Sequence, residues 1–111
     1  MSNFANTPKP PYYAVIFTSQ RAEGEKAEYE NMAERMVSLV STQPGFLGAE
    51  SVRDALGFGV TISYWESLDA ISNWKQNEAH LVAQQKGKTE WYENYITRIC
   101  KVEREYSLRE I

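Results

Sequence analysis

Apolar residues recur at helical spacing in two segments of this 111-residue chain. In residues 25–41 they fall at i, i+3, i+4, i+7, i+8 and i+11, which places them on one face of a helix. This face consists of Tyr29, Met32, Ala33, Met36, Val37 and Val40. Pro44 and Gly45 follow and predict that the helix stops before them.

The second helical segment begins after Ser67. A serine at this position can cap the helix, and Asp69 suits its first turn. The predicted apolar side consists of Ile71, Trp74, Leu81 and Val82. The Lys-Gly-Lys sequence at 86–88 predicts the end of the helix or a break in it.

Segments rich in β-branched and aromatic residues predict four strands. They cover residues 12–19, 46–53, 58–65 and 95–106. The turn at 54–57 joins the second and third strands as a hairpin, and residues 89–94 read as a short helical turn. Alternation places Thr61, Ser63 and Trp65 on one face of the third strand and Phe58, Val60, Ile62 and Tyr64 on the other.

The element order β-α-β-β-α-β predicts an α+β, ferredoxin-like domain over residues 12–111. Its four-stranded antiparallel sheet would carry both helices on one face. The strand at 12–19 is apolar on both sides, so the second face of the sheet also needs cover. A second copy packed sheet against sheet would give a two-fold homodimer.

Residues 1–11 read as a flexible arm. Three prolines lie within four residues here, which prevents a helix and disfavours a paired strand. Disorder and packing over a neighbour are both compatible with this composition.

The charge balance narrows the set of partners. A net charge of −3 gives no basic excess for phosphates, so we expect no nucleic-acid partner. No apolar run approaches the roughly 18 residues of a membrane span and no signal segment opens the chain, so we expect a cytoplasmic protein with no membrane partner. Cys100 is the single cysteine and is expected to be a buried structural thiol.

Chemistry-bearing residues concentrate after residue 63. This part holds every tryptophan, the single histidine and four of the seven tyrosines. An unperturbed histidine has a pKa of about 6.5, so His80 is the candidate general base. On an unbroken helix it shares a polar stripe with Asn73, Asn77 and Gln84, which favours a solvated face unless the helix breaks near 76–78. One histidine without further ligands predicts no metal site.

Aromatic and polar residues around His80 are candidates for substrate binding. Trp65, Trp74 and Tyr92 can stack on a flat ligand or simply fill the core. Asn77 or Gln84 can orient His80 or bind a substrate oxygen. Arg98 can pair with an anionic substrate or with a glutamate across a dimer.

Several short motifs carry a family resemblance across residues 12–106. They are Gln43-Pro44-Gly45-Phe46-Leu47-Gly48, Tyr64-Trp65-Glu66-Ser67, Trp74-Lys75, Glu78-Ala79-His80, Ala83-Gln84, Trp91-Tyr92, Tyr95, Arg98 and Val102-Glu103-Arg104. The chain resembles the antibiotic biosynthesis monooxygenase family of dimeric α-β barrel proteins. The resemblance implies a homodimer with a pocket between sheet and helices in each subunit. It also implies oxidation of an aromatic quinol-type substrate by dioxygen without flavin, haem or metal.

Other functions remain open alongside this one. The same fold could bind a small hydrophobic ligand without turnover, or form a purely structural dimer. Haem-degrading relatives have a tryptophan at the position of Trp74 but need an axial histidine about ten residues later, where this chain has Gln84. They also use an asparagine early in the first strand, which is absent here. Both departures count against haem, and we expect no cofactor.

Overall fold

The computed structural model describes residues 3–23, 26–84 and 92–108; for residues 26–29, 32 and 79–84 it describes the backbone alone. The elements are β1 (Tyr12–Arg21), α1 (Lys26–Val40), β2 (Phe46–Arg53), β3 (Phe58–Trp65), α2 (Leu68–Gln84) and β4 (Tyr92–Val102). Their order is the predicted one. The bounds of β2 and β3 match the prediction residue for residue.

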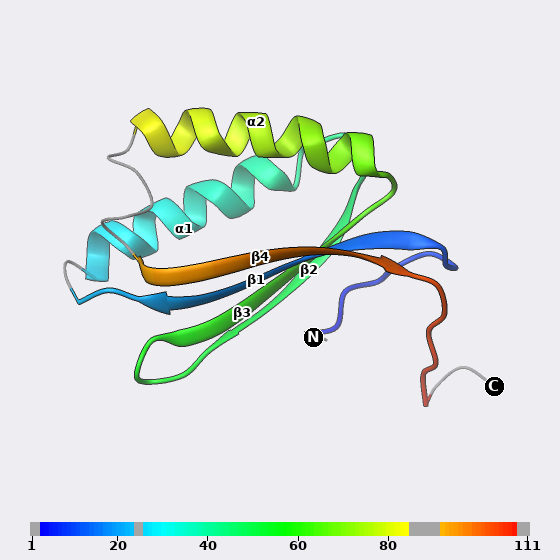
Figure 1. The fold of residues 1–111 in the computed structure, drawn as a ribbon, viewed down its shortest axis with the longest axis horizontal. Helices are drawn as coiled ribbons and strands as arrows, with labels where there is room; N and C mark the ends of the chain where they lie inside the picture. Colours follow the sequence, from blue (N-terminus) through cyan, green and yellow to red (C-terminus); the bar gives the residue numbers. More distant parts are fainter. Residues whose placement is uncertain (1–2, 24–25, 85–91, 109–111) are drawn as a thin grey trace.

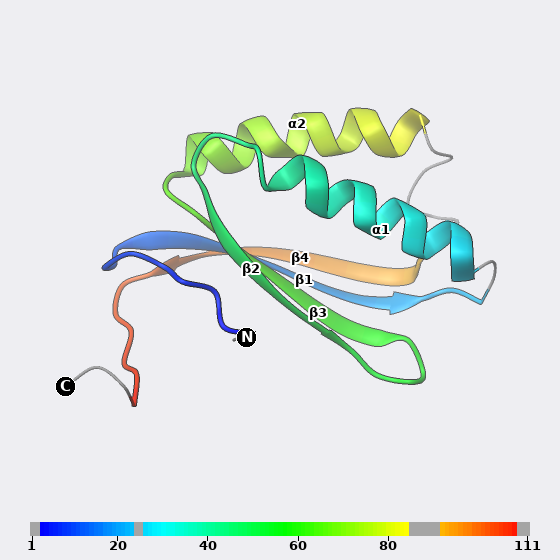
Figure 2. The ribbon, with the colours of Figure 1, turned by 180° about the vertical axis from the view of Figure 1, so that it is seen from behind.

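The strands form one antiparallel sheet in the order β2-β3-β1-β4. β1 and β3 lie in its centre, with Tyr13 paired to Trp65 and Val15 to Ser63. Both helices lie on the same face of this sheet (Figure 1, and from behind in Figure 2). The predicted α+β, ferredoxin-like architecture is therefore confirmed.

The turn after α1 depends on a glycine. The amide of Gln43 donates to the carbonyl of Val40 at 3.0 Å as the helix ends. Gly45 then has a φ of 83°, in the left-handed region that favours glycine. A Cβ added there would lie 2.6 Å from the Cβ of Ala70, so Gly45 also lets this turn pass close to α2.

The start of α2 is capped as predicted. The hydroxyl of Ser67 accepts a hydrogen bond from the amide of Ala70 at 3.1 Å. Asp69 lies in the first turn, where a carboxylate suits the helix dipole. The helix then runs unbroken to Gln84, including residues 76–78.

The last strand differs from its prediction. β4 begins at Tyr92, so the helical turn expected across 89–94 is wrong for residues 92–94; residues 89–91 lie outside the described part of the chain. β1 continues to Arg21, which pairs with Tyr92; the register shifts between Gln20 and Arg21 and leaves Glu93 of β4 as the extra residue. This pairing extends both strands beyond what their local patterns indicate.

β4 also ends earlier than predicted, at Val102 instead of residue 106. Val102 pairs with Tyr12, the first residue of β1. Pro11 precedes Tyr12 and has no N–H with which to continue the ladder.

The buried core lies between the sheet and the helices. Val15 and Trp65 from the sheet pack with Ile71 and Trp74 from α2, and each is at most 8% exposed. Partly buried residues from α1 and the start of β2 surround this cluster: Met36, Leu39, Val40 and Phe46.

The arm and the segment after β4 lie on the side of the sheet opposite the helices, called here the open face (Figure 1). The amide of Ala5 donates to the Glu50 carboxylate at 2.9 Å. The hydroxyls of Thr7 and Tyr12 both donate to Glu105. These contacts define where the arm lies, while its flexibility stays a prediction.

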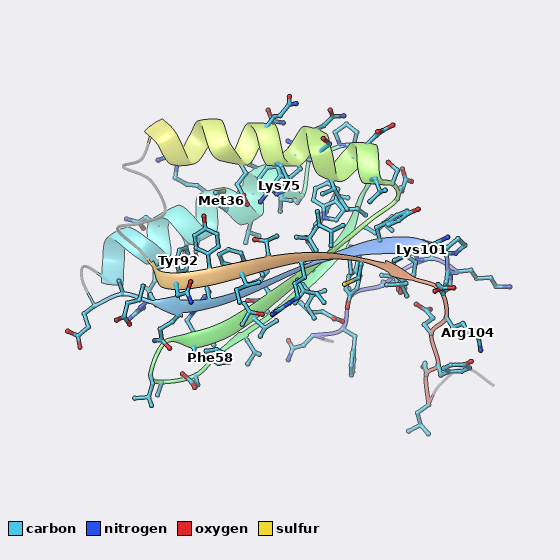
Figure 3. The ribbon with its side chains drawn as sticks, viewed as in Figure 1. Met36, Phe58, Lys75, Tyr92, Lys101 and Arg104 are labelled. Carbon is cyan, nitrogen blue, oxygen red and sulfur yellow. The ribbon has the colours of Figure 1, made fainter. Side chains whose placement is uncertain are left out.

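Much of the open face carries uncovered apolar side chains. Val52 is 71% exposed, Phe58 52% and Ile96 46%. Phe58 lies on the opposite side of the sheet from Met36 and Tyr92 (Figure 3). Cys100 is also exposed, so its predicted burial is wrong for the single chain; none of the described residues covers it.

Candidate functional site

A cavity of about 440 Å³ lies between the sheet and the two helices. Alternate residues of a strand point to the same side. Val15 and Phe17 of β1 and Thr61 and Ser63 of β3 therefore line the cavity from the sheet. The predicted faces of the third strand are confirmed at these positions.

The opposite wall comes from α1. Ala33, Met36, Val37 and Val40 line the cavity, as expected for the apolar face of this helix. Met36 and Tyr92 are seen between helices and sheet in Figure 3. The cavity lining is therefore largely apolar, and its polar side chains come from the strands and from α2.

Trp74 and Tyr92 both line the cavity, so two of the predicted binding residues come together there. Phe17 packs edge-on against Tyr92, with ring centroids 5.3 Å apart and planes at 74°. Trp65 lies behind Trp74 and is 0% exposed. It donates from its indole nitrogen to the Ser63 hydroxyl at 2.9 Å, so it supports the wall from within the core.

Other predicted site residues lie away from the cavity or outside the described side chains. Asn77 is exposed and donates to the Gln43 side-chain oxygen at 3.0 Å. Arg98 follows the cavity-lining Thr97 on β4, so it faces the open side of the sheet. The backbones of His80 and Gln84 belong to α2, but their side chains lie outside the described part, and their roles stay predictions.

The sequence analysis missed Arg53, which lines the cavity from the end of β2. Its Nη2 donates to the Ser19 hydroxyl at 2.8 Å, and its Nη1 donates to the Ser19 carbonyl at 3.3 Å and to the carbonyl of Gly57. Its guanidinium carbon lies 5.9 Å from the centroid of the Tyr92 ring. The sequence did contain a signal for this position: Arg53 alternates with Ala49 and Ser51, so the three residues lie on the same face of the strand.

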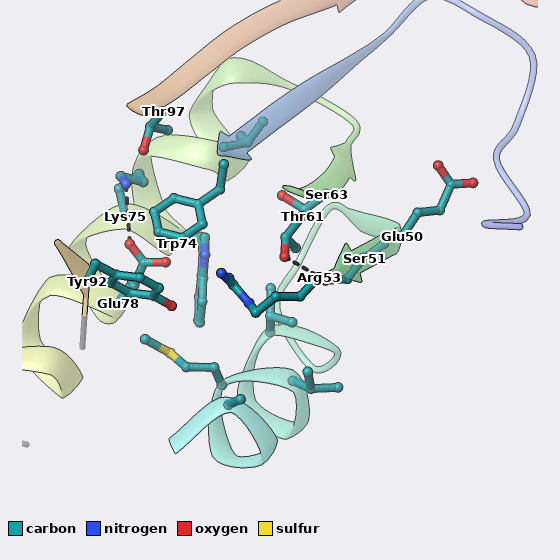
Figure 4. Close-up of a pocket in the computed structure, with 17 residues that line it drawn as sticks. Glu50, Ser51, Arg53, Thr61, Ser63, Trp74, Lys75, Glu78, Tyr92 and Thr97 are labelled. Atoms are coloured by element: carbon teal, nitrogen blue, oxygen red, sulfur yellow. Dashed lines mark hydrogen bonds and ion pairs between the residues drawn. The ribbon is translucent and has the colours of Figure 1, made fainter. Parts of the chain in front are cut away.

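An ion pair on α2 was missed as a site feature too. Lys75 and Glu78 are 3.2 Å apart at the i, i+3 spacing that brings side chains together on a helix, and both line the cavity. Figure 4 shows them beside Trp74 and Thr97. The spacing was visible in the sequence, but it did not indicate which way the pair faces.

Among the residues whose side chains are described, the resolved pKa shifts lie on the open face and not in the cavity. Burial, and then the hydrogen bond to the Glu50 carboxylate at 2.6 Å, raise the pKa of Tyr64. Burial and the hydrogen bond to Glu105 raise the pKa of Tyr12. The two tyrosine rings also pack edge to face, 5.7 Å apart. This network holds the arm and the terminal segment against the sheet.

Together these features define an α+β protein that encloses a ligand-sized cavity between one antiparallel sheet and two helices. The chain belongs to the antibiotic biosynthesis monooxygenase family, whose model matches residues 12–86. The resemblance drawn from its motifs is thus confirmed.

Comparisons with individual proteins agree with this membership. The Bacillus subtilis (strain 168) protein named "Uncharacterized protein YqjZ" is 51% identical over 110 residues, covering 99% of this chain and 96% of YqjZ. The structure of PA3566 from Pseudomonas aeruginosa matches with a TM-score of 0.66 at 19% identity, covering 89% of this chain and 99% of PA3566. SnoaB, a cofactor-independent oxygenase from Streptomyces nogalater, matches with a TM-score of 0.66 at 16% identity, covering 91% of this chain and 100% of SnoaB. The two structural matches show a shared fold.

No helix among the described residues is both long and apolar enough to cross a membrane.

Proposed function

We propose that the protein is a cofactor-independent, monooxygenase-like enzyme that oxidises a small aromatic or quinol-type substrate with dioxygen. The observation that carries this proposal is the cavity, whose volume of about 440 Å³ suits a small aromatic molecule. The rings of Phe17, Trp74 and Tyr92 flank it. Aromatic rings favour offset or edge contacts with a flat ligand. Family membership supplies the type of reaction.

In this reaction the protein has two main tasks, which are to hold the substrate in position and to accept its proton. A deprotonated, electron-rich substrate passes an electron to dioxygen. Where a ring methylene becomes a carbonyl, the substrate supplies all four electrons, one oxygen atom enters the product and the other leaves as water. The protein holds the ring, accepts the proton and excludes water.

His80 is the residue proposed to take the proton. Gln84 would orient it or bind a substrate oxygen. Asn77 would act by orienting it, because its side chain lies away from the cavity and is bonded to Gln43. The three positions follow one another at helical spacing on α2, which also supplies Trp74 to the cavity. Trp65 would act by holding Trp74 in place.

Oxygen uptake with a panel of quinols and phenols tests this function. Where a ring C–H or methylene becomes a carbonyl, labelled dioxygen should place one labelled atom in the product and the other in water; simple oxidation of a quinol to a quinone should instead release hydrogen peroxide. We expect His80→Ala to lower turnover by about 10²–10⁴-fold while substrate still binds. Asn73→Ala, an exposed position on the same helix, is the matched control. Unchanged turnover in His80→Ala would remove the role given to His80, and no uptake with any substrate would remove the reaction.

A second candidate is a protein that binds a small hydrophobic ligand without turnover. The unbroken α2 favours it, because a polar stripe on a continuous helix is usually solvated and Asn77 in that stripe is exposed. This function predicts ligand binding without oxygen uptake. Haem binding, the third alternative, predicts a Soret band when haem is added.

The proposal includes a cytoplasmic homodimer. Its support is the open face, where Val52, Phe58 and Ile96 are exposed in the single chain. Sheet-to-sheet packing of a second copy would cover them. Arg98 faces the same side as Ile96 and would pair with a glutamate of the second copy.

A further inference from the structure

We infer that Ser63 donates a hydrogen bond to the ionised oxygen of the bound substrate, and that Trp65 orients the Ser63 hydroxyl for this contact. The inference rests on the proposed function, in which an aromatic alcohol loses its proton in the cavity. It names the residue that binds the oxygen after the proton has left, and it gives the site a preference for phenolates over phenols.

The Ser63 hydroxyl is held by a buried partner. Ser63 and Trp65 are two residues apart on β3, so their side chains lie on the same face of the sheet. The Trp65 indole nitrogen donates to the Ser63 hydroxyl oxygen at 2.9 Å, and Trp65 is 0% exposed. Because an indole nitrogen can only donate, Ser63 must be the acceptor in this bond.

This bond leaves the proton of Ser63 for a ligand. A hydroxyl has one proton and two acceptor lone pairs, and the bond from Trp65 uses one of the lone pairs. Within the described part of the chain, the Ser63 hydroxyl donates to no protein acceptor. Ser63 lines the cavity, so an oxygen atom of a bound substrate can accept this proton.

The neighbouring hydroxyls of the same wall are bonded differently. Ser51 and Thr61 face each other on β2 and β3, and their hydroxyl oxygens are 2.8 Å apart. One of the two donates to the other, and this pair is exposed. Their bond stays within the lining, whereas the bond of Ser63 reaches into the core. Ser63 is therefore the hydroxyl whose orientation depends on the core.

The oriented hydroxyl and the aromatic surface belong to one cavity. Trp65 packs against Trp74, and Trp74 lines the cavity together with Ser63. Figure 4 shows Ser63 and Thr61 in one wall, and Trp74 and Tyr92 in the walls formed by other elements. A flat ring that packs against Trp74 would thus have Ser63 available to an oxygen on its edge.

An ionised oxygen gains more from this donor than a neutral oxygen does. Hydrogen bonds to charged groups are roughly twice as strong as those between neutral groups. A hydroxyl that already accepts a hydrogen bond, as Ser63 does from Trp65, is polarised and donates more strongly. The largely apolar lining increases both effects, because it lowers the local dielectric constant. Ser63 should therefore stabilise a bound phenolate more than a bound phenol.

Binding of 4-nitrophenol to the full chain tests the inference, because the phenol and its anion differ in colour. Its affinity is measured by spectrophotometric titration below and above the pH at which the free probe ionises. We expect Ser63→Ala to lower the ratio of phenolate affinity to phenol affinity about tenfold relative to the wild type. Ser38→Ala makes the same chemical change at an exposed position of α1 outside the cavity lining, and should leave this ratio unchanged.

An unchanged ratio in Ser63→Ala would overturn the inference, since a purely structural role would weaken the binding of both forms alike. An equal fall of the ratio in Ser38→Ala would overturn it as well. In both cases, binding of the probe by the wild type leaves the aromatic site of the proposed function in place. Binding of neither form by the wild type would remove that site and the inference together.

Ser63→Ala leaves the buried Trp65 indole nitrogen without its acceptor, so this variant can fail to fold. Ser63→Cys then decides the matter. A thiol can still accept from Trp65 but is a weak donor, so the ratio should fall several-fold. A ratio in Ser63→Cys equal to that of the wild type would contradict the role of Ser63.

Discussion

Trp65 stacks against Trp74 with ring centroids 6.3 Å apart and planes at 24°, yet only Trp74 reaches the cavity. One ring belongs wholly to the core, and the other is shared between the core and the site. The pair therefore joins the packing of the sheet to the shape of the binding surface.

Substitution of the two tryptophans should separate stability from binding. Trp65→Phe replaces a fully buried indole with a smaller ring and removes the hydrogen bond to Ser63, so we expect it to lower the free energy of unfolding by about 1–3 kcal/mol. Trp74→Phe should cost less stability, because one side of this ring faces the cavity, but should weaken aromatic ligand binding more. Urea denaturation and calorimetry measure the two effects. Equal losses of stability with equal losses of binding would contradict this division.

Gly45 and Ala70 should be energetically coupled. Gly45→Ala places a side chain on left-handed backbone and 2.6 Å from the Ala70 Cβ, so we expect a loss of about 2–4 kcal/mol. Ala70→Gly alone should cost about 1 kcal/mol, as glycine does in a helix. The double variant should lose less stability than the sum of the two single losses. Ala70→Gly removes the Cβ with which the new side chain clashes, so the backbone strain at position 45 and the helix cost at position 70 remain without the clash. Additive losses in urea denaturation would show that the contact is unimportant.

Local patterns predicted most of this fold. The hairpin of β2 and β3 and the Ser67 cap depend on residues close in sequence, and both are confirmed. The apolar face of α1 is confirmed from Ala33 onward, while the side chains of Tyr29 and Met32 lie outside the described part. The start of β4 was missed because it depends on pairing between Arg21 and Tyr92, which lie far apart in the chain. No short window contains that information.

The site was less predictable for the same reason. Aromatic residues such as Trp74 and Tyr92 attract notice in any sequence. Arg53 becomes a site residue only because β1 brings Ser19 beside it, 34 positions away in the chain. The exposure of Cys100 depends on whether a second chain covers the open face, a property that no pattern within one chain determines.

The hydrogen bond from Tyr64 to Glu50 should make stability fall at alkaline pH. Burial and this hydrogen bond raise the pKa of Tyr64 in the folded state above the unfolded value of about 10. Its contribution is therefore complete below about pH 10 and is lost as the pH rises toward the folded-state pKa, because the unfolded state releases its proton first. Tyr64→Phe should make the loss of stability above about pH 10 less steep, as measured by urea denaturation across this range.

Tyr106→Phe is the matched control for this experiment. Its side chain is 85% exposed in the segment after β4. The free energy of unfolding of this variant should therefore fall with rising pH as steeply as that of the wild type. An alkaline slope in Tyr64→Phe identical to that of the wild type would show that the Tyr64–Glu50 contact does not contribute.

The open face gives the last prediction, which concerns assembly. If a second copy covers Val52, Phe58 and Ile96, then Ile96→Glu buries a charge in the interface and should convert the dimer to 12.8 kDa monomers. Leu68→Glu is the matched control, because Leu68 is 54% exposed on the helical layer and an acidic residue suits the first turn of α2. Native mass spectrometry measures the assembly of both variants.

Cys100 supplies a second readout of the same prediction. Its thiol lies on the open face and should react faster with a thiol reagent in the monomeric variant than in the wild type. A monomeric wild type with a rapidly reacting thiol would mean that the apolar open face stays uncovered.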